Sequence, residues 1–140
     1  MLGKVSVKMN DKRSRFIPII IVAVNVLAVI VRWSSLPELM PAHFDLEGNA
    51  GGTMSRSVLL MYPLIGAVIC LAAYVIARIK PKMQTGLVVL ASGICLVLLS
   101  STMVSLTYGK VPLFMLAEPV IMLAAVVAFA VCVVKSRKSK

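Results

Sequence analysis

Residues 58–77 read VLLMYPLIGAVICLAAYVIA, a run of twenty residues without a charged side chain. An α-helix rises about 1.5 Å per residue, so this run spans about 30 Å, the thickness of the hydrocarbon core of a bilayer. The stretch therefore predicts a transmembrane helix.

Three further apolar runs flank this one, over residues 16–31, 85–108 and 112–134. The first is the shortest, and it reaches the interface if Arg32 snorkels and Trp33 lies among the headgroups. The connections at 78–84 and 109–111 are short and predict antiparallel neighbours, whereas residues 32–57 form a longer, structured loop. We predict an all-α bundle of four transmembrane helices.

The composition excludes a soluble globular protein. The 140 residues are 60% hydrophobic and 14% charged, with a mean hydropathy of +0.99, whereas a soluble domain has roughly 25% charged residues. The net charge of +10 is concentrated at the ends of the apolar runs. This placement favours the anionic headgroups of a lipid bilayer as the partner and argues against nucleic acid.

The same basic residues predict the orientation in the membrane. Of the 15 Lys and Arg residues, all but Arg32, Arg56 and Lys110 belong to a basic arm (1–15), to the connection at 78–84 or to a basic tail (135–140). Short cytoplasmic segments carry the excess of Lys and Arg, so we predict cytoplasmic N and C termini and an outer loop between the first two spans.

The outer loop contains the most informative pattern, LPELMPAHFDLEGNAGG over residues 36–52. Pro37 and Pro41 exclude a regular helix, and glycines from Gly48 onward supply turns. Residues 43–47 alternate between polar and apolar side chains. In an extended chain, Phe44 and Leu46 would face the helices and the polar side chains would face water or a cavity.

The polar face of this segment would carry His43, Asp45 and Glu47, for which three interpretations are open. The face is a solvated acidic loop, a site for a divalent cation, or a group that transfers protons. A single histidine without a second histidine or a cysteine is not a typical zinc site. We therefore expect no cofactor, with a divalent metal at these three residues as the alternative.

Leu36-Pro37, then Pro41-x-His43-Phe44-Asp45-x-x-Gly48, a glycine-rich turn and an apolar helix with Pro63 resemble the bacterial domain of unknown function 1648. The resemblance covers about residues 16–82. It implies a multi-pass protein of the bacterial cytoplasmic (inner) membrane. It also implies a relation to SdpI-type immunity proteins, membrane proteins that protect a cell from its own secreted peptide toxin.

A polar group lies at a similar depth in each predicted helix, beneath the outer loop. These groups are Asn25, Tyr62, Ser101 and Glu118. An ionisable residue inside a span indicates function by default, although Asn25 and Ser101 also suit a role in holding helices together. We predict an outward-open polar pocket lined by the four and covered by His43 and Asp45.

These features predict a non-enzymatic recognition or immunity-type protein that binds a peptide toxin or another membrane protein through the outer loop and pocket. The alternatives are a small transporter or channel component, or a metal-dependent membrane enzyme, using His43, Asp45 and Glu118. Four helices leave little room for a pathway through one chain, so transport would require a homo-oligomer.

Overall fold

The computed structural model describes residues 11–45, 47–108, 110 and 112–138. Its helices are α1 (Asp11–Ser14), α2 (Ile17–Arg32), α3 (Met61–Ile79), α4 (Gln84–Leu106) and α5 (Pro112–Lys138). Its strands are β1 (Leu39–Phe44) and β2 (Ala50–Ser55), and three short 3-10 helices are η1 (Trp33–Ser35), η2 (Arg56–Leu60) and η3 (Pro81–Met83).

In the part of the chain that the structure describes, four helical segments are long and apolar enough to cross a membrane: Ile17–Ser35, Arg56–Ile79, Pro81–Leu106 and Leu116–Lys138. The chain is therefore a mostly helical, multi-pass membrane protein, as its hydropathy predicts. The short first run gains length because η1 continues it through Ser35. The last helix runs to Lys138, beyond the predicted end at residue 134.

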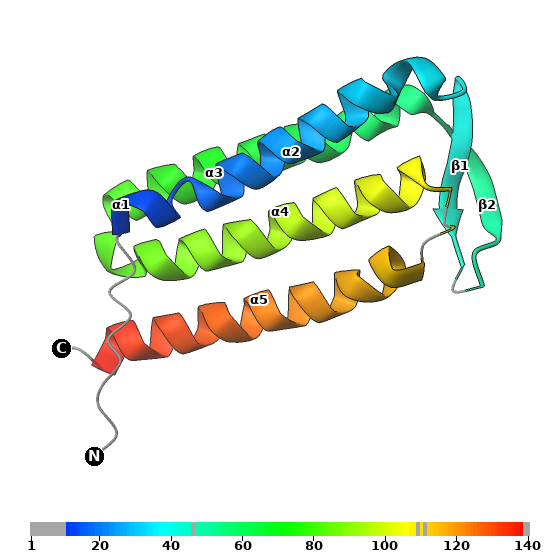
Figure 1. Ribbon diagram of the computed structural model, residues 1–140. Coiled ribbons are helices and arrows are strands. Elements are labelled where there is room, and N and C mark those ends of the chain that lie inside the picture. The colour runs from blue at the N-terminus through cyan, green and yellow to red at the C-terminus, as the bar shows by residue number, and fades with distance from the viewer. Residues whose placement is uncertain (1–10, 46, 109, 111, 139–140) are drawn as a thin grey trace.

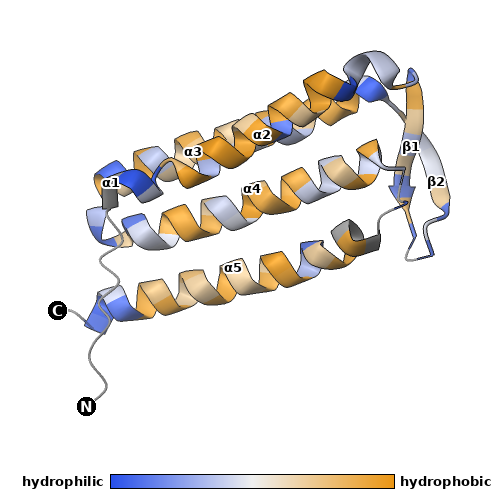
Figure 2. Cartoon of the chain, viewed as in Figure 1, coloured by the Kyte–Doolittle hydropathy of each residue, from blue (hydrophilic) through white to orange (hydrophobic). Residues whose placement is uncertain are grey.

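Helix α4 is the centre of the fold and contacts α2, α3 and α5 (Figure 1). Helix α5 lies against α4 on the side away from α2 and α3. The residues of the long helices are largely hydrophobic (Figure 2), and many of their large hydrophobic side chains are exposed. Such surfaces are stable where lipid, not water, surrounds the helices.

Glycines permit the closest approaches between helices. A Cβ atom at Gly93 of α4 would collide with Ala125 of α5, and one at Gly86 would lie 3.2 Å from Cys132 Cβ. On the other side of the bundle, Gly66 of α3 faces Val22 of α2. Small residues at membrane helix interfaces let backbones come together and gain dispersion energy.

The two strands form an antiparallel hairpin that pairs Leu39 with Ser55 and Phe44 with Ala50. Figure 1 shows the hairpin across one end of the helices, with α1 and the end of α5 at the opposite end. We call these the hairpin end and the basic end, because the latter collects the described residues Arg13, Arg15, Arg78, Lys80, Lys82, Lys135, Arg137 and Lys138.

A buried cluster fixes the hairpin to the helices. Its fully buried members are Val29 from α2, Met40 from β1 and Leu59 from η2, with Leu36 and Leu106 beside them. Because the cluster joins three helical segments to β1, the hairpin is an integral part of the fold.

The predicted extended segment over residues 43–47 is wrong in its second half. Strand β1 ends at Phe44, and the chain turns at Asp45. The turn forms because Asp45 accepts hydrogen bonds from the following backbone, which an extended chain would not permit. Leu46, expected to face the helices, lies outside the described residues.

Candidate functional site

Asp45 closes the hairpin turn. Its Oδ1 accepts hydrogen bonds from the backbone N–H groups of Glu47 at 3.0 Å and Asn49 at 2.7 Å, and its Oδ2 accepts one from Asn49 Nδ2 at 2.9 Å. Gly48 takes the positive φ of 86° that the turn needs. The hydrogen bonds from Asn49 and the turn backbone hold the pKa of the exposed Asp45 carboxyl below its usual 3.8.

His43 lies on β1 directly opposite Gly51 of β2. A Cβ atom at Gly51 would overlap the His43 ring, so the imidazole covers this glycine. The ring therefore fills the space that a side chain at position 51 would occupy.

The side chains of His43, Asp45 and Glu47, predicted to share one polar face, do not come together as ligands for a metal ion. Both Asp45 oxygens accept hydrogen bonds within the turn, and Glu47 Oε2 accepts one from Asn49 Nδ2 at 3.4 Å. Among the described residues, no three His, Cys, Asp or Glu side chains lie close enough together to hold a metal ion.

Arg56 joins the two sides of the hairpin base, a role that the sequence did not suggest. Its Nη1 donates to the Leu36 carbonyl at 3.2 Å, and its guanidinium lies 5.0 Å from the centroid of the Trp33 ring. Its backbone N–H donates to the Glu38 carbonyl at 2.9 Å. The one feature of the sequence that points to this contact is a tryptophan at the start of the loop and an arginine at its end.

The four polar residues of the predicted layer occupy different interfaces. Ser101 of α4 donates to Glu118 Oε1 of α5 at 2.8 Å, so these two meet as expected. Tyr62 packs against the buried cluster at the hairpin end. Asn25 is 2% exposed, and its Oδ1 has no hydrogen-bond partner within the described part of the chain. The central position of α4 separates α5, which carries Glu118, from α2 and α3.

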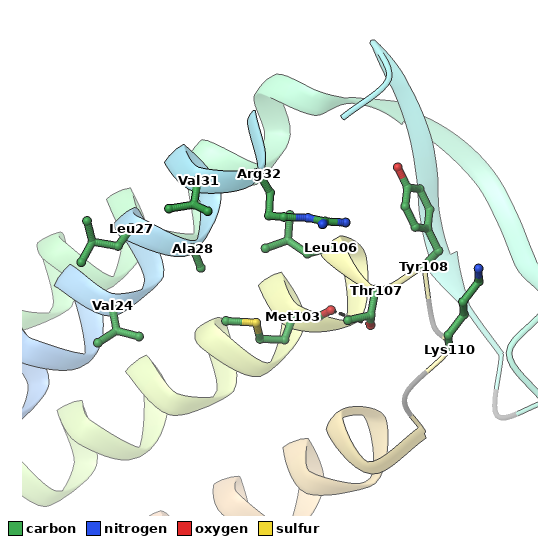
Figure 3. A pocket seen from close by; sticks show the side chains of 10 residues that line it. All are labelled: Val24, Leu27, Ala28, Val31, Arg32, Met103, Leu106, Thr107, Tyr108 and Lys110. Carbon is green, nitrogen blue, oxygen red and sulfur yellow. Dashed lines mark hydrogen bonds between the residues drawn. The ribbon is translucent and has the colours of Figure 1, made fainter. Parts of the chain in front are cut away.

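The structure has a groove at the hairpin end (Figure 3). None of the four residues of the predicted polar pocket lines it. It has a volume of about 810 Å³. Apolar residues of α2, such as Val24 and Leu27, face Met103 and Leu106 of α4. The remaining lining includes Arg32, Thr107, Tyr108 and Lys110.

Tyr108 adopts a left-handed backbone conformation, with a φ of 52°. It follows the C-cap of α4, where glycine is usual because a side chain costs energy at positive φ. Its side chain also packs against the buried cluster, so the groove is bordered by a residue held by both α4 and the hairpin.

One segment of the chain, which holds most of α2, the hairpin and the start of α3, matches a known family. Residues 20–67, about a third of the chain, match the family described as Domain of unknown function (DUF1648). No curated protein and no solved structure matches the chain. The matched segment includes Pro37, Pro41, His43, Phe44 and Gly48, on which the resemblance rests, so residues 20–67 are similar to that family.

Proposed function

We propose that this chain is a non-enzymatic membrane protein that recognises an extended segment of a peptide or of a membrane protein at its hairpin end. The observation that carries the proposal is the outer edge of β2. Within the described residues the sheet has two strands, so β2 pairs with β1 alone. An unpaired edge can accept another strand through backbone hydrogen bonds.

The hairpin is built to present this edge. The Asp45 turn, the Arg56 contacts and the buried Met40 hold both strands in place, and β1 is the strand that contacts α4. A preorganised edge costs less conformational entropy on binding than a flexible loop would.

The two edges differ in their capacity to bind. On β1, Pro41 has no N–H to donate to an added strand, whereas all six residues of β2 have one. We therefore assign recognition to β2.

The basic end supports placing the hairpin outside the cell. Positive residues favour the cytoplasmic side, which puts the hairpin on the outer face of a bacterial inner membrane. A partner there would be a secreted peptide, as for an immunity protein, or an outer loop of another membrane protein. The groove beside α2 and α4, with Arg32 and Lys110 in its lining, would accept residues next to the paired strand.

The test replaces one backbone donor. Thr53→Pro removes one backbone N–H of β2, and Thr53→Val keeps it with a side chain of similar size. A photoreactive residue at Ser55, introduced into the full chain in its native cells, should form a discrete adduct that mass spectrometry identifies. We expect at least a tenfold weaker adduct with Thr53→Pro and an unchanged one with Thr53→Val. Equal adducts, or an adduct equally strong from lipid-facing Leu123, would contradict strand pairing.

A further inference from the structure

A second groove lies at the basic end, between α2 and α3, with α4 as its floor. The two outer helices approach closely where Gly66 meets Val22, because a Cβ atom at Gly66 would lie 2.9 Å from Val22 Cγ2. Beyond this contact, toward the basic end, a groove of about 880 Å³ separates them. Ligand pockets typically measure roughly 300–1,000 Å³.

The interior of this groove is apolar. Ile19 of α2 and Leu71 of α3 line its sides, and Val88 and the buried Ala91 of α4 line its floor. Leu71 and Ile19 are more than half exposed. In a membrane these surfaces meet lipid, so a hydrocarbon chain is the ligand chemistry that the interior fits.

The mouth of the same groove carries two arginines from different helices. Arg15 donates to Gln84 Oε1 at 2.8 Å. Arg78 donates to the Tyr74 hydroxyl, and its guanidinium lies 5.1 Å from the centroid of that ring. Both acceptors are neutral, and each bond uses one of the five donors of a guanidinium. Among the described side chains, these interactions therefore leave both arginines without an acidic partner.

We propose that this groove binds one phospholipid with an anionic headgroup. An acyl chain lies between α2 and α3, and the phosphate lies between Arg15 and Arg78, where guanidinium groups bind phosphate oxygens in pairs. The surroundings strengthen the match, because Arg13, Lys80 and Lys82 belong to the same end. Basic pockets between transmembrane helices are suited to anionic headgroups.

Native mass spectrometry of the full chain in detergent tests the assignment. The protein is mixed with equal amounts of phosphatidylglycerol and phosphatidylcholine that carry identical acyl chains. We expect one bound phosphatidylglycerol per chain. A basic residue near an anionic lipid contributes about a fivefold preference, so Arg15→Gln with Arg78→Gln should lower the selectivity roughly 25-fold.

The matched control is Arg32→Gln with Lys110→Gln, which removes the same charge from the groove at the hairpin end. It should leave the selectivity unchanged. Ala73→Phe narrows the lipid groove while keeping both arginines, and it should reduce lipid retention. Arg15→Lys with Arg78→Lys keeps the charge and should retain most of the selectivity, which gives a readout even if the glutamine variant misfolds.

Three results would overturn the proposal. The first is equal retention of the two lipids by the unmodified chain. The second is an equal loss of selectivity in the control variant, which would indicate a general effect of charge. The third is full lipid retention by Ala73→Phe, which would mean that the arginines bind the headgroup without the groove.

Discussion

Asp45 gives the hairpin a dependence on pH. Its pKa is lower in the folded turn than in the unfolded chain, so its ionised form stabilises the turn above the unfolded value of 3.8, and this stabilisation is lost as the pH falls through the folded pKa. We expect the protection of the Asn49 amide against hydrogen exchange to decrease on acidification. Asp45→Asn, which keeps an acceptor oxygen, should remove this dependence, and Asp45→Ala should lower protection at every pH. An unchanged acid response in Asp45→Asn would assign the effect to another group.

The hydrogen bond between Ser101 and Glu118 is a polar link between α4 and α5. The sequence suggested such a linking role for Ser101, whereas it predicted Glu118 as a group of the polar pocket. Such bonds between transmembrane helices contribute about 0.6 kcal/mol on average and up to about 1.7 kcal/mol. Glu118→Gln keeps the acceptor and should change the free energy of unfolding little, whereas Glu118→Leu should destabilise by an amount in that range.

A double-mutant cycle isolates this contact. Ser101→Ala and Glu118→Leu should be non-additive in unfolding measurements, because each removes the same hydrogen bond. Additive effects would show that the two side chains act independently. Loss of recognition in Glu118→Gln, with unchanged stability, would instead assign the carboxylate a role as a charge.

At the scale of elements, the attachment of α5 to α4 depends on close backbone approach. Gly93→Ala should separate the helices, because the added methyl group overlaps Ala125, and overpacking typically costs about 1–3 kcal/mol. Ala125→Gly in the same chain removes the opposing methyl group and should recover part of the loss. Ala124→Gly is the matched control, since Ala124 is exposed and should not rescue. Rescue by Ala124→Gly would contradict this packing.

The elements show what hydropathy can and cannot predict. Runs of apolar residues predict the four spans because bilayer thickness imposes a length. They do not predict which helices meet, since lipid and helix surfaces are equally apolar. The small-residue spacings Ala73-x-x-x-Ala77 and Ala124-x-x-x-Ala128, for example, are typical of helix contacts. In the structure, Ala73 and Ala77 line the lipid groove, and Gly86 and Gly93 make close approaches to α5.

The candidate site was predictable only in part for a related reason. Prolines and glycines located the loop, and Asp45 belonged to its motif, but alternation alone could not distinguish an extended chain from a turn closed by side-chain hydrogen bonds. Depth along each helix placed four polar groups at one level. Depth carries no information about rotation around α4, which decides that Ser101 meets Glu118 while Tyr62 joins the hairpin cluster.

The whole molecule has two chemically different ends joined by apolar helices. The hairpin end holds Glu38, Asp45 and Glu47 beside its few basic residues, and the basic end holds arginines and lysines from α1, α3, η3 and α5. Because both grooves open at these ends, the orientation of the chain decides which one meets an external partner and which one meets cytoplasmic lipid. The recognition proposal therefore depends on which side of the membrane the hairpin end faces, and the lipid proposal depends on which leaflet the basic end meets.

Cysteine labelling of whole cells tests that orientation. In a chain whose native cysteines at 70, 95 and 132 are replaced, Asn49→Cys in the exposed hairpin turn should react with a membrane-impermeant maleimide, because the basic end is predicted to be cytoplasmic. Lys82→Cys, exposed in η3, should react only after the membrane is permeabilised. Both cysteines should react equally in detergent, which controls for accessibility. Labelling of Lys82→Cys but not Asn49→Cys in intact cells would invert the chain. The hairpin would then face the cytoplasm, and a secreted peptide could not reach β2.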